Sequence, residues 1–216
     1  MKTLEDIILD GYRTGIFPMA ESAEDEGFAF YKPYMRGLIP IKDLHIPAKL
    51  LKTIRRQPFD ITIDRSFEAV IDGCAAATPK RGKTWINTPI RDIFVGLHEA
   101  GHAHSIECRT KYGRLVGGLY GLAIGAVFCG ESMFSTERDA SKIALVYLCA
   151  LLWKCGYTVL DTQFINPHLL QFGAYEIPQE TYEQMIATEM KKPVIFDGHS
   201  CDLDTVLQDY LAVRQS

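Results

Sequence analysis

The sequence has no long uninterrupted apolar run, no internal repeat and no low-complexity tract. Residues 1–6 are acidic and are not followed by the apolar segment that a secretory signal or a membrane span requires. These absences predict a cytoplasmic protein that is not bound to a membrane. With 216 residues, of which 47% are hydrophobic and 23% are charged, the chain can bury one core, or one core with a small appendage.

Cysteine is present but lacks the C-x-x-C spacing of metal and redox motifs. Most of the cysteines lie within apolar segments, which argues against a disulfide framework and against a zinc site made of thiolates. We therefore expect reduced, packed thiols. The six residues are Cys74, Cys108, Cys129, Cys149, Cys155 and Cys201.

Positive charge is in the minority overall but is concentrated in two segments. The net charge is −4 at pH 7, yet residues 32–60 hold seven Lys or Arg against two Asp or Glu, and residues 79–114 hold seven against three. Residues 115–216 reverse the balance, with six basic and twelve acidic residues. This pattern allows a local contact with a polyanion. The alternative is a solvated helix face, which would carry Lys49, Lys52, Arg55 and Arg56.

The apolar periodicity predicts an α+β fold with a mixed sheet. Strands at residues 103–110, 115–124 and 126–134 follow one another closely, which favours an antiparallel meander. A long apolar helix then runs from residue 139 or 141 to residue 155, and a strand follows at 157–164. One more strand is expected at 59–64, and helices are expected at 4–13, 47–57, 67–77, 89–100, 178–190 and 202–213.

One carboxylate stands out in the glycine-rich strand region at residues 117–135. Glu131 is flanked by Phe128, Met133 and Phe134, and a carboxylate in such surroundings costs several kcal/mol to bury, as a rough figure, unless a cation or a set of donors meets it. The natural candidate for that cation is an amine. The glycines alone have a simpler explanation, because they also permit tight turns and close sheet packing.

Residues 98–102 read H-E-A-G-H, which matches the H-E-x-x-H pattern of zinc proteases. That pattern requires one helix to carry both histidines. Gly101 is a typical helix stop, and residues 102–108 alternate like a strand. His98 and His102 would then point apart and brace a helix-to-strand corner, so we expect no metal here.

Asp161 and Gln163 lie near the end of the strand that follows the long helix. The two-residue period of a strand places them on one face, where a carboxylate and a carboxamide can orient or deprotonate an amine. Asn166 and His168 follow and can belong to the same polar group. The alternative is that these side chains bond the backbone or cap a helix.

Taken together, the motifs resemble the bacterial leucyl/phenylalanyl-tRNA-protein transferases over about residues 11–190. The matching segments are Gly15-Ile16-Phe17-Pro18, Thr84-Trp85-Ile86, residues 97–107 (LHEAGHAHSIE), residues 115–121 (LVGGLYG), residues 128–135 (FCGESMFS), Asp139-Ala140-Ser141-Lys142, Asp161-Thr162-Gln163 and residues 173–178 (GAYEIP).

The resemblance implies a catalytic domain similar to the GCN5-related acetyltransferase fold at residues 46–216, preceded by a small, reduced N-terminal domain at residues 1–45. It implies an enzyme that acts as a monomer, moves Leu or Phe from its tRNA to proteins beginning with Arg or Lys, and so creates an N-degron for protein degradation. Met is a further candidate for the transferred residue. No cofactor is implied, because an aminoacyl-tRNA ester is already activated.

The resemblance also assigns roles to residues. Asp161 acts through Gln163 as a relay that deprotonates the acceptor amine, and Glu131 holds the α-ammonium of the transferred residue or the cationic acceptor side chain. The substrate site is built from Leu119, Phe128, Gly130, Met133, Phe134, Trp85, Tyr31 and Asn166.

Recognition of the tRNA would depend on phosphate contacts and on a stacked terminal adenosine. Trp85 follows a basic loop and can stack, although an ordinary core tryptophan is the alternative. Tyr31 can stack where many relatives have a tryptophan-rich strand. The phosphate contacts are assigned to Lys80, Arg81, Lys83, Lys52, Arg55 and Arg56.

Two rival functions can be compared with this one. An acetyl-CoA-dependent N-acetyltransferase of the same fold would need a glycine-rich pyrophosphate loop, but residues 135–141 read STERDAS, with no glycine and two acidic residues. A binding module for tRNA or degrons that has lost transfer activity is the other rival, because the chain starts late relative to longer family members. Turnover distinguishes this module from the enzyme.

Overall fold

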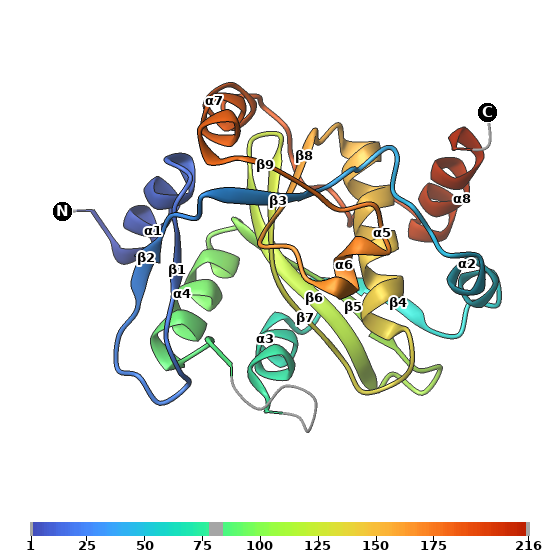
Figure 1. Cartoon of the computed structure of the whole chain (residues 1–216). Coiled ribbons are helices and arrows are strands. Elements are labelled where there is room, and N and C mark those ends of the chain that lie inside the picture. The colour runs from blue at the N-terminus through green and yellow to red at the C-terminus, as the bar shows by residue number, and fades with distance from the viewer. Residues whose placement is uncertain (1, 78–83, 215–216) are drawn as a thin grey trace.

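Three strands follow one another closely in the middle of the chain. The computed structural model describes residues 2–77 and 84–214. Strands β5 (Ala103–Arg109), β6 (Leu115–Ile124) and β7 (Val127–Ser135) pair antiparallel in sequence order. The predicted meander is therefore confirmed (Figure 1).

These strands belong to a seven-stranded mixed sheet with the order β4-β5-β6-β7-β8-β3-β9. Among the described strands, β7 and β8 (Val159–Gln163) alone pair in parallel, because the long helix α5 (Ala140–Cys155) connects them. The remaining strands of this sheet are β4 (Asp60–Ile63), β3 (Met35–Ile39) and β9 (Tyr175–Pro178), and a separate two-stranded sheet consists of β1 (Phe17–Met19) and β2 (Ala29–Tyr31). The predicted α+β class with a mixed sheet is confirmed.

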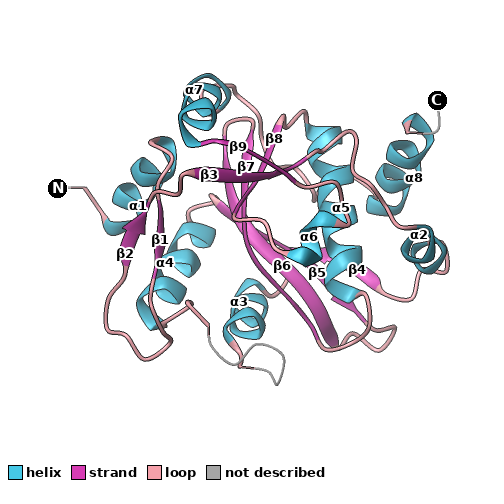
Figure 2. Cartoon of the chain, in the orientation of Figure 1, coloured by secondary structure: helices cyan, strands magenta, loops and turns pink. Residues whose placement is uncertain are grey.

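Helices cover both faces of the large sheet (Figure 2). The apolar α5 packs on one face, together with α2 (Ala48–Ile54) and α8 (Leu203–Val213). The opposite face is covered by α1 (Leu4–Arg13), α3 (Phe67–Ala75), α4 (Thr88–Glu99) and α7 (Gln179–Glu189). The short helix α6 (Pro167–Leu170) follows β8. In the described part of the chain, no helix combines the length and apolarity needed to cross a membrane.

The N-terminal segment contributes directly to the main sheet. β3 lies between β8 and β9, antiparallel to both, although its residues fall within the predicted N-terminal domain. The domain boundary near residue 45 stays a prediction. The strand that precedes it, β3, lies inside the main sheet and not in a separate unit. The sequence pattern predicts neither β3 nor β9.

Candidate active site

The two parallel strands separate after a short stretch of pairing. Their last paired residues are Cys129 and Asp161. Beyond this pair β7 continues to Ser135, whereas β8 ends at Gln163 and pairs with β3 on its other side. The opening between the strands holds a cavity of about 770 Å³, which is within the usual size range of ligand sites.

Both layers of helices contribute to the cavity wall. Leu145 and Leu148 come from α5 on one face of the sheet, and Gly73 comes from α3 on the other. Most of the predicted substrate-site residues also line it, namely Leu119, Gly130, Met133, Phe134, Trp85 and Asn166. The wall is mainly apolar, with Glu131 as its acidic residue, so the cavity suits an apolar group attached to an amine or facing one.

Two predicted substrate-site residues do not line this cavity. Phe128 is fully buried and packs its ring against Tyr157 and Phe196 instead. Tyr31 stacks on Phe17, at 6.4 Å between ring centroids, and Phe17 contacts Phe164 of the cavity wall edge-on. Phe128 therefore supports the site from the core, and the ring of Phe17 lies between Tyr31 and the cavity wall.

Glu131 lies on the cavity wall and is only partly exposed. The hydroxyl of Tyr12, on α1, donates a hydrogen bond of 2.7 Å to its Oε1. Its Oε2 accepts no hydrogen bond from the described residues. Burial raises the pKa of Glu131 to about 8, against the opposing effect of the Tyr12 hydrogen bond. This carboxyl therefore titrates in the same range as a protein α-amine, whose pKa is about 7.7–8.0.

The amide of Gln163 lies next to Glu131. With its nitrogen toward Glu131, the two groups form a long contact of 3.4 Å. With the amide rotated by 180°, the nitrogen donates to the carbonyls of Gly130 and Thr162, at 3.1 and 3.2 Å. The rotated arrangement satisfies more hydrogen bonds and turns the amide oxygen toward Glu131.

Asp161 is fully buried and paired with Arg36, whose side chain is also completely buried. The guanidinium binds the carboxylate through Nε at 2.8 Å and Nη2 at 2.6 Å. The Tyr182 hydroxyl donates to Oδ2 and the backbone N–H of Gln163 donates to Oδ1, both at 2.9 Å. Each oxygen of Asp161 thus accepts two hydrogen bonds from the protein, and none of its surface faces the cavity.

Three residues of this site were missed from the sequence: Tyr12, Arg36 and Tyr182. Tyr12 and Tyr182 sit on the apolar faces of helices and read as ordinary core residues. An arginine inside a short apolar strand such as β3 is a usable signal, because a buried guanidinium requires an acidic partner. The sequence does not indicate which of the acidic residues that partner is.

The H-E-x-x-H segment forms the predicted corner. α4 ends at Glu99, Gly101 adopts a left-handed conformation with φ +78°, and β5 begins at Ala103. The Nδ1 of His98 contacts the carbonyl of Ala103 at 2.8 Å, and its ring stacks on Phe67. The described residues contain no group of three His, Cys, Asp or Glu side chains arranged to hold a metal ion.

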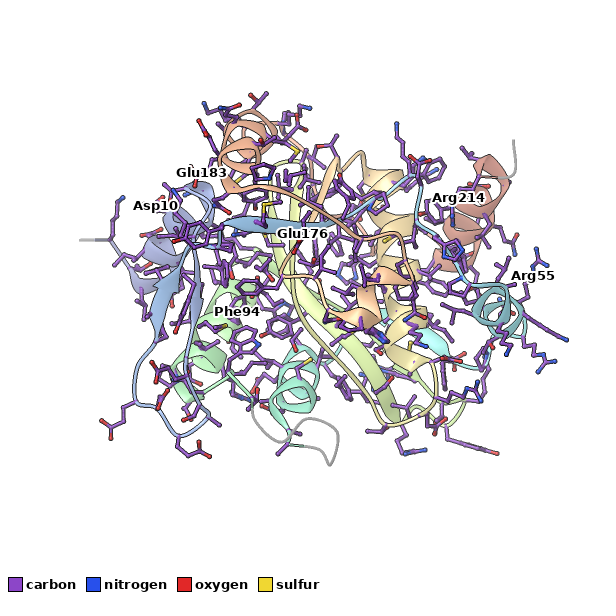
Figure 3. All side chains as sticks on the ribbon, viewed as in Figure 1. Asp10, Arg55, Phe94, Glu176, Glu183 and Arg214 are labelled. Atoms are coloured by element: carbon purple, nitrogen blue, oxygen red, sulfur yellow. The ribbon has the colours of Figure 1, made fainter. Side chains whose placement is uncertain are left out.

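The predicted phosphate-binding residues fall into two groups. Lys80, Arg81 and Lys83 lie outside the described residues. Lys52 is on α2 and Arg55 and Arg56 follow it directly, and all three side chains are exposed, with no carboxylate partner among the described ion pairs. Figure 3 shows Arg55 projecting outward beside α2, at the side of the molecule away from α1.

Comparison with known proteins gives consistent matches over most of the chain. A family model described as leucyl/phenylalanyl-tRNA protein transferase matches residues 38–187. A curated leucyl/phenylalanyl-tRNA–protein transferase of Rhodopseudomonas palustris is 45% identical over 96% of this chain and 92% of its own length. The protein of that name from Novosphingobium aromaticivorans is 51% identical over 84% of this chain and 69% of its own length.

A further relative with this name, from Nitrobacter winogradskyi, is 49% identical over 84% of this chain and 80% of its own length. Among solved structures, L-PGS from Bacillus licheniformis aligns with 93% of this chain and 73% of its own, with a TM-score of 0.44 and 12% identity. This structural likeness is too low to imply a shared activity or ligand.

Proposed function

The chain belongs to the leucyl/phenylalanyl-tRNA protein transferase family, and from this premise we propose that it transfers Leu or Phe from aminoacyl-tRNA to the N-terminal Arg or Lys of acceptor proteins. The new N-terminal residue would mark the product for degradation. We further propose that the protein works in the cytoplasm, as a monomer and without a cofactor. Whether Met is also transferred is part of the same test.

The observation that carries the proposal is the cavity between β7 and β8. Its apolar wall, which includes Leu119, Met133 and Phe134, suits a leucyl or phenylalanyl side chain, since burial is worth about 25 cal/mol per Å² of apolar surface. Glu131 lies on the same wall, where the ester and the acceptor amine must meet. Such a pocket distinguishes Leu from Phe poorly and rejects β-branched residues by shape.

The strand arrangement supports our proposal that the main sheet is of the GCN5-related type. A meander leads into a parallel pair that is connected by α5 and opens at the substrate cavity. The N-terminus of α5 disfavours acetyl-CoA as the donor, because Asp139 adopts a left-handed conformation there and Glu137 lies two residues before it. A pyrophosphate would meet these carboxylates rather than a loop of free backbone N–H groups.

For the tRNA, we propose contacts on both sides of the cavity. Trp85 lines the cavity and is partly exposed, so it can stack on the terminal adenine. Tyr31 supports this end through Phe17 and Phe164. The exposed cations at and after α2 would bind phosphates of the tRNA, because they have no carboxylate partner among the described ion pairs.

The test is a transfer assay. Purified protein is mixed with tRNA carrying radiolabelled leucine, phenylalanine or methionine and with a protein that begins with Arg. Label is then followed into acid-precipitable product that survives base hydrolysis of the ester. A protein that differs only in beginning with Glu is the matched control, and EDTA is added to a parallel reaction.

We expect label in the Arg-terminated protein, much less in the control, and no effect of EDTA. Absence of transfer with intact tRNA binding would overturn the proposal in favour of a binding module. Asp161→Ala is a poor negative control, because it leaves the Arg36 charge buried without a partner. Glu131→Gln keeps the shape of the side chain and is the better choice.

A further inference from the structure

We propose that Glu131 is the group that takes the proton from the incoming α-ammonium, with Tyr12 and Gln163 as its positioning partners. The inference rests on the proposed transfer reaction and assigns a different base from the Asp161 relay implied by the family resemblance. Asp161 then has a positioning role: its ion pair with Arg36 fixes the end of β8.

The carboxylates of Glu131 and Asp161 differ in their access to the cavity. Glu131 lies on the cavity wall and its Oε2 accepts nothing from the described residues, so an amine in the cavity can reach it. Asp161 has no exposed surface, and four protein donors occupy its two oxygens. A base must be within hydrogen-bond reach of the proton that it removes, and of these two carboxylates Glu131 is the one that meets this condition.

The described neighbours of Glu131 contact one of its oxygens and leave the other free. The Tyr12 hydroxyl donates at 2.7 Å and stabilises the carboxylate. In its rotated arrangement, Gln163 is held by the carbonyls of Gly130 and Thr162, and its amide lies beside Oε1, the oxygen that Tyr12 also contacts. Oε1 is therefore fixed by protein groups, and Oε2 is left open to take the proton from the cavity and to release it there.

The position of Gln163 is fixed by the Arg36 ion pair. Its backbone is left-handed, with φ +54°, and its N–H donates to Asp161 Oδ1. Arg36 holds that carboxylate and also donates to the carbonyl of Gly15 at 2.9 Å. Loss of either member would release the end of β8 and change the orientation of the Gln163 amide.

The charges around Glu131 support this role. Burial raises its pKa to about 8, Tyr12 and Arg36 lower it, and Asp161 raises it. Cys129 is the other titratable neighbour, and burial raises the pKa of its thiol well above the ordinary value, so it stays neutral. Proton transfer from an ammonium with a pKa of about 8 to this carboxylate is therefore close to energetically balanced.

The proposed step conserves atoms and charge. The ammonium N–H bond breaks and the proton moves to the Glu131 carboxylate, which frees the nitrogen lone pair to attack the ester carbonyl carbon. The C–N bond forms, the C–O bond to the tRNA ribose breaks, and the second proton of the amine goes to the departing ribose oxygen. Glu131 then releases its proton to solvent.

The first experiment compares the wild type with Glu131→Gln in single-turnover transfer at about pH 7 and about pH 9, corrected for ester hydrolysis without acceptor. At pH 7 we expect the transfer rate of the variant to be roughly 100-fold or more below that of the wild type. Between the two pH values its rate should rise about tenfold, because the neutral fraction of an amine with a pKa near 8 rises by that factor. An equal loss at both pH values would show that Glu131 only anchors a cation and would overturn the proposal.

A second pair of variants tests the positioning role of Tyr12. Tyr12→Phe removes the donor that stabilises the carboxylate, so the acidic limb of the pH–rate profile should move to higher pH. Tyr147→Phe is the matched control, because Tyr147 is also buried and donates to a carboxylate, Asp204, at 2.6 Å, without lining the cavity. An unchanged profile in Tyr12→Phe would exclude the role of Tyr12.

The outcomes distinguish this inference from the proposed function. If the wild type transfers no label, the function itself fails. If the wild type transfers label and Glu131→Gln is as fast at pH 7, the function stands and the inference fails.

Discussion

Arg36 and Asp161, 125 residues apart in the chain, form a bidentate ion pair from which solvent is completely excluded. The pair joins β3 to β8 at the strand end where the cavity opens. The guanidinium also lies over the rings of Phe17 and Tyr182, at 4.9 and 4.4 Å. The N-terminal segment is thereby tied to the catalytic region by charge as well as by packing.

Breaking this pair should destabilise the fold strongly. Asp161→Asn or Arg36→Gln leaves one buried charge without a counterion, and we expect each to lower the free energy of unfolding by about 3–5 kcal/mol. The double variant Arg36→Gln/Asp161→Asn removes both charges and should lie closer to the wild type than either single variant. Urea denaturation gives the free energy of unfolding of all three variants.

The control for this prediction is an exposed ion pair. Lys111 and Asp60 are 60% and 51% exposed, so Lys111→Ala should change stability by roughly 0–1 kcal/mol. Single variants of Arg36 and Asp161 that behave like this control would show that the buried pair does not hold the strands together.

The second prediction concerns stability against pH. The Glu131 carboxyl titrates near 4.5 when unfolded and at about 8 when folded, so between these values the folded state keeps a proton that the unfolded state has released. The free energy of unfolding should therefore fall as pH rises through this range and level off above about pH 8. At about 1.4 kcal/mol per pKa unit, the upper bound of the loss is roughly 5 kcal/mol.

Glu131→Gln cannot ionise, so it should lack this part of the pH dependence. Urea unfolding of both proteins at about pH 5.5 and about pH 8.5 gives the difference directly. The variant should be the more stable protein at the higher pH, although it is the poorer catalyst. Parallel losses of stability in the two proteins would contradict the raised pKa.

Local chemistry explains which elements could be predicted from the sequence. Gly101 ends α4 in a left-handed conformation that glycine adopts without strain, and Gly156 ends α5 in the same way. Alternation likewise identifies β5, and apolar segments rich in glycine identify β6 and β7. Each of these signals lies within a few residues of the feature that it predicts.

β3 and β9 depend instead on distant partners. β3 spans five residues, of which one is the fully buried Arg36, and it is a strand because β8 and β9 pair with it on both sides. The active site likewise contains some features with a local sequence signal and others without one. Glu131 could be singled out because a charge interrupts an apolar segment, whereas its hydrogen bond to Tyr12 spans 119 residues and has no local signal.

The third prediction tests the shape of the cavity. A Cβ atom at Gly73, on α3, would lie only 2.8 Å from ring atoms of Phe134, so Gly73→Ala must displace a ring that lines the cavity. We expect kcat/KM to fall for both donors, and more for phenylalanyl-tRNA because its side chain is larger. Gly96→Ala on α4 is the control, since its Cβ would meet only the flexible Glu5 side chain. Equal activity of the two variants would show that the Phe134 ring does not shape the substrate pocket.

The fourth prediction concerns the exposed cations at and after α2. Arg55→Gln and Arg56→Gln should each weaken tRNA binding if these side chains contact phosphates. The slope of log K against log salt concentration should then become shallower by roughly 0.7–0.9 per lost contact, because fewer counterions are released. Binding is measured by filter retention or fluorescence anisotropy at several salt concentrations, with deacylated tRNA as the ligand.

Lys191→Gln is the matched control, because Lys191 is also exposed and has no carboxylate partner among the described ion pairs, but it follows α7 on the other face of the sheet. A general effect of net charge would lower the salt slope equally in all three variants, since each loses one positive charge. A phosphate contact at α2 lowers it only in Arg55→Gln and Arg56→Gln. If neither arginine variant changes the slope, these side chains form a solvated helix face, and the tRNA must be held by other residues around the cavity.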